Sequence, residues 1–458
     1  MTEDIDMFTF ADKALRSIEN NCNNIKCSEV YLSKDSYINI EIEENSIKNS
    51  KLGTEAGISV RVIDNRGSLG FSFTNKLEDR TIKKIVKSAV RMMKVGTPDP
   101  DFSNLPNKYN NYPTVKGLYD KNIEQLEIED SSTYIKDMIN VCEDDENAIS
   151  QSAKFKSNFS ETCIFNSNGI EISGRETICS ISSNIIVKDK ITNQTSFGFD
   201  WQTVRNIKDL NSQTIALNAL ERAKQHLVRK NIKNMKIPIV LTPIGTINLI
   251  LSPIISAINA ETFQYKRSFL IGKRGVKIGS ELLNIDDNAL IEGGAGSCVF
   301  DDEGIPGRNK KIIEKGTLLQ QGLLHNSYTA AKEGIESTGN AIRSSYSTLP
   351  SIDATNFILK HGEISKEEII KDIKQGILFE YSGDSANIST GDFSGLILQG
   401  NLIENGEIKH SLNNTMFGIN LMELFQNINL ISKEYKTYGP FQAPYVKIDN
   451  VQIIGNAN

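Results

Sequence analysis

Apolar and polar residues alternate strictly in two stretches of the N-terminal half. The apolar positions are Ile38, Ile40 and Ile42, then Ile58, Val60 and Val62. Because successive side chains of a strand point to opposite faces, this pattern predicts strands with one face against a core. Two further segments, DNRG (64–67) and Asn168-Gly169 within CIFNSNGIEI, are typical of tight turns. Antiparallel hairpins are therefore expected.

Helical periodicity separates these β-rich stretches. Apolar residues recur every three or four positions in four segments, 5–21, 79–96, 121–142 and 211–229. Further along, Ser365 and Glu368 form the pattern of a capping box, and Gly376 is expected to end that helix. Residues 97–118 carry four prolines and predict a long exposed loop.

These elements predict an α+β fold of two domains with largely antiparallel sheets. The basic stretch VRKNIKNMK (228–236) follows a helix and contains few apolar residues, so we expect the domain boundary there. The prediction is an N-terminal α+β domain over 1–230 and a β-rich C-terminal domain over 231–458. Strands are expected to dominate 377–410 and 444–455.

The bulk properties restrict location and partners. Fifty-one basic and 57 acidic residues give a net charge of −6, which favours no nucleic-acid partner. No run of about 18 apolar residues predicts a membrane span. The N-terminus MTEDIDMFTF is acidic, unlike a signal peptide, and the six cysteines are scattered as in a protein with reduced, buried thiols. A cytoplasmic protein is expected.

The segment KEGIESTGNAIR (332–343) spaces two glycines as a phosphate-binding loop does. That loop also needs a lysine for the phosphates and a hydroxyl for Mg²⁺, but Asn340 and Ala341 occupy those positions. The preceding residues LLHNSYTAAKE look helical rather than like a strand. A nucleotide site is therefore not expected here.

Side chains for metal or nucleophilic catalysis are sparse. The chain has four histidines, and the closest two are 36 positions apart, so no helical pair can bind one metal ion. His226 is expected at the end of a helix, either solvated or interacting with the helix dipole, and His325 most simply as an exposed loop residue near the glycine-rich region. No G-x-S-x-G motif occurs.

Three adjacent carboxylates, Asp301, Asp302 and Glu303, leave two interpretations open. Such a run is often a turn that faces water, and Gly304 favours that backbone. Alternatively, the carboxylates could bind a hard cation or orient a peptide amine.

Five separated motifs occur in the order of the TldD/PmbA family, which the chain resembles along nearly its whole length. They are AGISVRVIDNRGSLGFSFT (56–74), FNSNGIEIS (165–173), DDEGIPGRNKKIIEKGTLLQ (301–320), KEGIESTGNAIR and GDFSGLILQGNLIENGEI (391–408). This resemblance implies an N-terminal α+β domain and a β-rich C-terminal domain. It also implies a cytoplasmic metallopeptidase that acts on unfolded peptides as a heterodimer of related subunits.

One segment distinguishes the branches of this family. TldD-like subunits carry H-E-x-x-x-H on a helix, and the matching segment here is LILSPIISAINAETFQYKRSFL (249–270). Ser252 and Ala257 stand at the histidine positions and Pro253 at the glutamate position. None of the three can act as a zinc ligand or a carboxylate base. The chain therefore resembles the PmbA/TldE branch, which lacks this metal site.

The resemblance implies that this chain holds no metal and that a TldD-like partner supplies a zinc-type ion. It also implies a shared channel for an extended peptide, bound largely through main-chain hydrogen bonds. The channel candidates are Asp301, Asp302, Glu303, Gly304, Arg308, His325, Ser337, Thr338, Gly339, Asn340 and Arg343, with either arginine available to pair the carboxylates. Two alternatives stay open: a self-sufficient homodimeric hydrolase with a noncanonical site, and a non-enzymatic regulator of the DNA gyrase modulator type.

Overall fold

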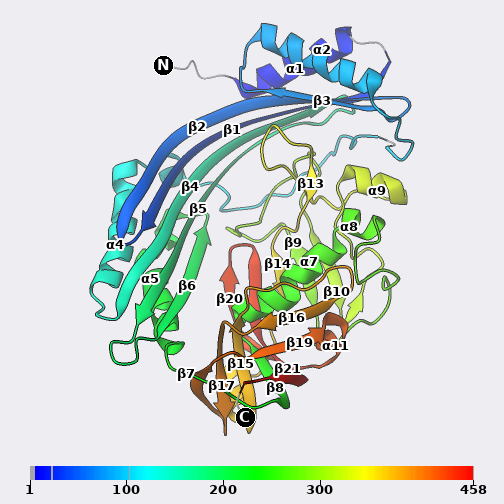
Figure 1. The fold of residues 1–458 in the computed structure, drawn as a ribbon. Coiled ribbons are helices and arrows are strands. Elements are labelled where there is room, and N and C mark those ends of the chain that lie inside the picture. Colours follow the sequence, from blue (N-terminus) through cyan, green and yellow to red (C-terminus); the bar gives the residue numbers. More distant parts are fainter. Residues whose placement is uncertain (1–5, 22–23, 103, 457–458) are drawn as a thin grey trace.

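A computed structural model describes residues 6–21, 24–102 and 104–456. Two large sheets organise the chain: an arched sheet from the N-terminal half stands over a second sheet from the C-terminal half (Figure 1). The predicted α+β class, the largely antiparallel pairing and the β-rich C-terminal half are confirmed.

The arched sheet has six antiparallel strands in the order β3-β2-β1-β4-β5-β6. Their bounds are β1 (Ile25–Glu43), β2 (Ser46–Asp64), β3 (Leu69–Thr74), β4 (Ala148–Asn166), β5 (Glu171–Lys188) and β6 (Thr195–Val204). β1, β2 and β4 each contain 19 residues. A strand of that length spans about 60 Å, and its natural twist over such a distance is consistent with the arch.

Helices cover the outer, convex face of the arch (Figure 1). α1 (Met7–Asn21) and α2 (Asp79–Val95) pack on one end, and α4 (Ile128–Glu143) and α5 (Ser212–Gln225) on the other. The alternating isoleucines of β1 face α4 and α5 in a buried core, as the pattern predicted. Two shorter elements precede these, α3 (Lys121–Glu124) before α4 and a 3-10 turn (Ile207–Asp209) before α5.

The second sheet has 13 strands, mostly antiparallel, along the path β11-β10-β9-β14-β21-β8-β15-β17-β18-β7. Three more strands, β16, β19 and β20, pair beside this path. The bounds are β7 (Arg229–Lys230), β8 (Met235–Leu241), β9 (Ile285–Asn288), β10 (Asn309–Glu314), β11 (Thr317–Leu318), β14 (Phe357–Leu359), β15 (Gln375–Tyr381), β16 (Asp392–Leu396), β17 (Gln399–Glu404), β18 (Glu407–Leu412), β19 (Met416–Asn420), β20 (Ile428–Tyr438) and β21 (Phe441–Ile454). A separate ribbon pairs β12 (Ala341–Ile342) with β13 (Ser351–Ile352).

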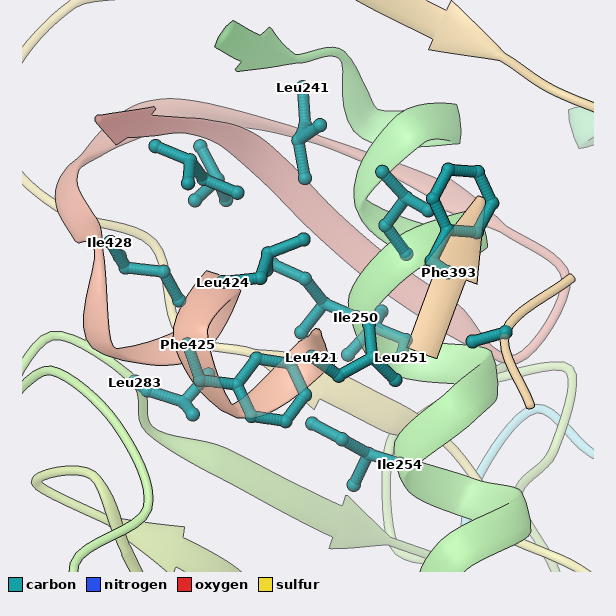
Figure 2. Packing of buried hydrophobic residues seen from close by; sticks show 14 of the residues in the cluster. Leu241, Ile250, Leu251, Ile254, Leu283, Phe393, Leu421, Leu424, Phe425 and Ile428 are labelled. Atoms are coloured by element: carbon teal, nitrogen blue, oxygen red, sulfur yellow. The ribbon is translucent and has the colours of Figure 1, made fainter. Parts of the chain in front are cut away.

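A central helical segment forms the core of the C-terminal half. It runs through α6 (Pro243–Thr246), a π-helical stretch (Ile247–Leu251) and α7 (Ser252–Ile258). Figure 2 shows Leu251 and Ile254 of this segment beside Leu421 and Phe425 of the C-terminal half, all fully buried. The remaining helices are α8 (Ala260–Gln264), α9 (Ser327–Glu333), α10 (Lys366–Lys371) and α11 (Leu421–Gln426).

Most local predictions are confirmed, including the capping box of Ser365 and Glu368 and the hairpin turn at Gly169, whose φ is +91°. The helix expected over 121–142 is divided into α3 and α4. The helix end expected at Gly376 is wrong, because α10 ends at Lys371 and Gly376 belongs to β15. Among the helices of the described residues, none combines the length and apolar character needed to cross a bilayer.

His226 caps the end of α5, and the solvated alternative is wrong. Its side chain is 1% exposed, and Nδ1 lies 2.8 Å from the carbonyl oxygen of Arg222. Burial lowers the pKa of this histidine, so it is neutral at physiological pH. The cysteines Cys27, Cys142, Cys163 and Cys179 are buried free thiols, whereas Cys22 lies outside the described residues.

Candidate functional site

A candidate site lies between the inner face of the arched sheet and loops of the C-terminal half. It is a cavity of about 480 Å³, which we call the central cavity. β1, β4 and β5 form its floor, and loops at 295–302, 339–345 and 353–355 form its wall. A space of this size can hold several residues of a peptide or a small ligand.

Residues of β1 form the centre of the floor. Tyr31, Ser33 and Asp35 are alternate residues of this strand, so all three point to the inner face and line the cavity. On the neighbouring β4, Ser160 Oγ and Asn158 Nδ2 donate hydrogen bonds to Asp35 Oδ1 at 2.6 and 3.2 Å. The floor is therefore polar, in contrast to the apolar outer face.

Two aromatic rings rest on the sheet where it has glycines. A Cβ atom at Gly57 of β2 would lie 2.4 Å from the ring of Tyr346, and one at Gly174 of β5 would lie 2.9 Å from the ring of Phe300. Tyr346 also donates a hydrogen bond to Glu55 Oε1 at 3.1 Å. The missing side chains thus let both wall loops approach the arched sheet.

Asp301 and Glu303 are buried and Asp302 is half-buried, so the interpretation as a turn facing water is wrong. Asp301 is 5% exposed and Glu303 is fully buried. Asp301 Oδ1 accepts hydrogen bonds from the backbone N–H groups of Glu303 and Ile305, each at 2.9 Å, and Oδ2 accepts one from Ala341 at 3.0 Å. Asp301 therefore holds the turn at Gly304, whose φ is +80°, against β12.

Glu303 belongs to a buried ion network that connects the two halves of the chain. Arg61 Nη2 of β2 lies 2.6 Å from Glu29 Oε2 of β1 and 2.8 Å from Glu303 Oε1. Arg343 Nη2 bonds the other oxygen of Glu29. At the start of α9, the Ser327 N–H and Oγ–H donate to Glu303 at 2.7 and 2.6 Å. Every charge in this network therefore has a partner of opposite charge.

The pKa values reflect these surroundings. Burial and the nearby Glu303 carboxylate raise the pKa of Asp301 to about 8. The three backbone N–H groups that bond its carboxylate have the opposite effect, but a smaller one. Burial raises the pKa of Asp302 to about 6. Burial alone would raise the pKa of Glu303, but Arg61 and Ser327 outweigh it and the pKa lies below its usual value. The same two carboxylates, Glu29 and Glu303, keep Arg61 charged despite its burial.

Five predicted channel candidates meet at the central cavity, namely Asp301, Asp302, Gly339, Asn340 and Arg343. Asp302 Oδ2 accepts a hydrogen bond from the Arg343 backbone N–H at 2.6 Å, and Oδ1 lies 3.5 Å from the Tyr31 hydroxyl. The Arg343 guanidinium lies 4.5 Å from the centre of the Tyr31 ring. Its carboxylate partner is Glu29 rather than one of the acidic run.

The other candidates lie outside the residues that line this cavity: Glu303, Gly304, Arg308, His325, Ser337 and Thr338. They fix the surrounding loops. Arg308 Nη2 donates to the carbonyl oxygen of Ser337 at 2.8 Å, so it does not pair the acidic run. Thr338 Oγ1 donates to Asn340 Oδ1 at 2.7 Å, and Asn340 Nδ2 donates to the buried Asp287 at 2.9 Å. These bonds give the S-T-G-N segment a structural role.

His325 is buried, and the expectation of an exposed loop residue is wrong. Its side chain is 1% exposed, and Nδ1 lies 3.2 Å from Thr329 Oγ1. Burial lowers its pKa to about 4. The neutral imidazole stabilises the start of α9.

Sequence reasoning missed Glu29, Tyr31, Ser33, Asp35 and Arg61. A usable signal was present for the two charged network residues. Arg61 stands between Val60 and Val62 in a strand whose outer face is apolar, and Glu29 precedes the apolar start of β1. A charge at an inner-face position of a strand needs a partner if that face is covered.

The residues of α7 do not fit a zinc ion. Ser252 is half-buried, Pro253 and Ala257 are buried, and these three occupy the positions of the H-E-x-x-x-H ligands and base. A hydroxyl, a pyrrolidine ring and a methyl group offer no imidazole or carboxylate donor. Across the described ranges, no three His, Cys, Asp or Glu side chains are grouped so that they could hold a metal ion.

Family comparisons agree with this architecture. Three family models match: PmbA/TldA metallopeptidase domain 1 over 28–93, the central domain over 121–227 and the C-terminal domain over 234–455. A PmbA metalloprotease homologue from Buchnera aphidicola is 28% identical, with 94% of each chain covered. A zinc metalloprotease TldD homologue from Saccharolobus solfataricus is 27% identical, with 84% of each covered.

The fold also matches a solved structure. The crystal structure of TldE from Thermococcus kodakarensis superposes with a TM-score of 0.87 at 24% identity, over 97% of this chain and 100% of that one. The three matched models together span most of the sequence, in the order that the five motifs predicted. The chain belongs to the PmbA/TldD family of metallopeptidase proteins.

Proposed function

We propose that this chain is the PmbA/TldE-like subunit of a cytoplasmic, two-subunit metallopeptidase that degrades or processes unfolded peptides. The chain contributes channel wall and subunit interface, and a TldD-like partner holds the zinc ion and the general base. The family assignment and a zinc metalloprotease among the relatives support this division.

The observation that carries the proposal is the chemistry of α7. This helix is buried through Ile254, Ala257 and Ile258, so its position is fixed, but its surface has no metal donors where the TldD-like motif has them. Hydrolysis of a peptide bond by this family's zinc chemistry therefore requires ligands from another chain.

Within this chain, we assign peptide binding to the central cavity. Asp302, Asn340 and Arg343 stand in its wall, and the polar floor of β1 and β4 faces them. An extended peptide fits such a polar trough because its main chain can use hydroxyl, amide and carboxylate partners at every step.

Metal content and activity test the proposal. The purified chain is expected to bind no stoichiometric zinc by mass spectrometry of metals and to leave a casein-derived peptide mixture uncut. Addition of a co-encoded TldD-like protein is expected to form a heterodimer and produce cleavage that a chelator abolishes. Chelator-sensitive cleavage by the isolated chain would instead support a homodimeric hydrolase. The same peptide-cleavage assay distinguishes the two outcomes.

A further inference from the structure

The Ser33 hydroxyl is a polar group without a partner at the floor of the central cavity. Ser33 is 4% exposed, and within the described residues its Oγ has no hydrogen-bond partner. A buried hydroxyl without a hydrogen bond is unfavourable, and most such groups in native proteins are satisfied by protein or water. Because Ser33 also lines the cavity, a bound ligand is a suitable partner.

Of the two inner-face neighbours of Ser33 on β1, one is a carboxylate and the other contacts one. Asp35 is the next inner-face residue of β1, and same-face neighbours of a strand are about 7 Å apart. Tyr31 is the inner-face neighbour on the other side, and its hydroxyl lies 3.5 Å from Asp302 Oδ1. A third carboxylate, Asp353, lines the same cavity and accepts a hydrogen bond from the backbone N–H of Ala354 at 2.7 Å.

The arginines of the cavity already have carboxylate partners. Arg175 pairs with Glu161 at 2.9 Å, and Arg205 pairs with Glu176 at 2.8 Å. Arg343 lies near Asp302, but its guanidinium bonds Glu29.

The three aspartates differ from these arginines. Across the part of the chain that the structure describes, Asp35, Asp302 and Asp353 form no ion pair with a lysine, arginine or histidine. The side-chain donors to Asp35 are neutral, namely Asn158 and Ser160. Burial raises the pKa of both Asp302 and Asp353, as expected for carboxylates without a matching cation. Asp35 on the floor and Asp302 and Asp353 in the wall are thus carboxylates without an ion-pair partner among the described residues, although Arg343 offsets part of the charge of Asp302.

We infer that the floor of the central cavity binds a primary ammonium group, with Ser33 Oγ, Asp35 and Asp302 as its acceptors. An ammonium has three N–H donors and no acceptor, which matches one hydroxyl between two carboxylates. Either a lysine side chain or a peptide amino terminus supplies this group. That the ligand is a peptide rests on the proposed function, whereas the recognition of the ammonium does not.

The experiment measures binding to the full-length chain by isothermal titration calorimetry. The probes are acetylated and amidated heptapeptides, Ser-Ala-Gly-X-Gly-Ala-Ser, in which X is lysine, norleucine or glutamate. A fourth probe has X as norleucine and a free amino terminus, and a fifth is n-butylammonium alone. The lysine peptide is expected to bind about tenfold more tightly than the norleucine peptide, because charge-assisted hydrogen bonds are the strong ones. The fourth probe identifies an amino-terminal preference.

Three variants locate the site. Asp35→Asn and Asp302→Asn are each expected to reduce the lysine preference, the ratio of lysine-peptide to norleucine-peptide affinity, at least threefold. Ser33→Ala should weaken lysine binding without loss of thermal stability, because this hydroxyl has no hydrogen-bond partner among the residues that the structure describes. Glu43→Gln, on the same strand and outside the cavity, is the matched control and should retain the full preference.

The outcomes separate this inference from the proposed function. Equal affinity for the lysine, norleucine and glutamate peptides overturns the ammonium site and leaves peptide binding intact. Binding of n-butylammonium that Asp35→Asn weakens, with no peptide bound, supports the site and contradicts peptide binding. A lysine preference that all three variants retain also overturns the assignment.

Discussion

Replacement of Arg61 by methionine tests whether the buried ion network holds the two halves of the chain together. Arg61 is 4% exposed and bridges Glu29 on β1 and Glu303 in the wall loop. Methionine has a similar length but leaves two buried carboxylates without this cation. The loss of one partner from a buried ion pair typically costs about 3–5 kcal/mol.

The contacts that remain after the replacement indicate a cost at the lower end of that range. Glu29 keeps Arg343, and Glu303 keeps both hydrogen bonds from Ser327, so neither carboxylate is left without a partner. We therefore expect Arg61→Met to reduce the free energy of unfolding by about 3 kcal/mol at neutral pH. Addition of Glu303→Gln to this variant removes a charge that has lost its ion-pair partner and should restore about 1–2 kcal/mol, a coupling typical of neighbouring residues.

Urea titration followed by fluorescence of the single tryptophan is a suitable assay. The ring of Trp201 of β6 lies 4.5 Å from the ring of Tyr438 of β20, at an interplanar angle of 37°, so its emission reports contact between the two halves. Arg66→Met is the matched control, because Arg66 is 56% exposed and should change stability by less than about 0.5 kcal/mol. The reasoning fails if Arg61→Met costs less than about 1 kcal/mol, or if the double variant is no more stable than the single one.

Three further predictions concern the cavity and its wall. Gly57→Ala places a methyl group into the Tyr346 ring and should destabilise the protein by about 1–3 kcal/mol, measured by urea titration, whereas a neutral result would show that the loop moves freely. Asn340→Ala removes the donor to buried Asp287 and should cost about 1–3 kcal/mol in the same titration, with no loss expected if water replaces the amide. The Asp302 carboxylate becomes neutral below about pH 6, so calorimetric affinity for the lysine peptide should fall as the pH drops through that value, and Asp302→Asn should abolish this dependence.

The fold was largely predictable because its strands and helices carry one-sided apolar patterns. The isoleucines of β1 and the capping box at Ser365 are local signals, and the structure confirms both predictions. The end of α10 was not predictable in this way, since Gly376 has a role in β15, where a side chain would approach the Pro238 carbonyl oxygen at 3.0 Å. The burial of His325 was not predictable either, because segments distant in the sequence cover it and the adjacent residues give no sign of this.

The strand register that pairs Glu29 with Arg61 can be derived from the sequence pattern of β1 and β2. β1 and β2 meet at a two-residue turn, Glu44-Asn45, with positive φ at both residues. Continued without interruption, that register would place Val60 opposite Glu29. The alternating apolar residues on the outer face of both strands have even numbers, however, and a common face requires partners whose numbers sum to an even value. A register shift beside the turn resolves the conflict and brings Arg61 opposite Glu29.

The network and the cavity depend on one short loop. Asp302 faces the cavity, and the next residue of the turn, Glu303, faces the network. Arg61 and Ser327 hold the adjacent Glu303 in place, and the Arg343 backbone N–H donates to Asp302 directly. These contacts together fix the position of the Asp302 carboxylate. Binding sites are most selective when their groups are held in place before the ligand arrives. A buried ion network is a weak source of net stability, so its placement directly behind the cavity wall is better explained by the orientation of the Asp302 carboxylate.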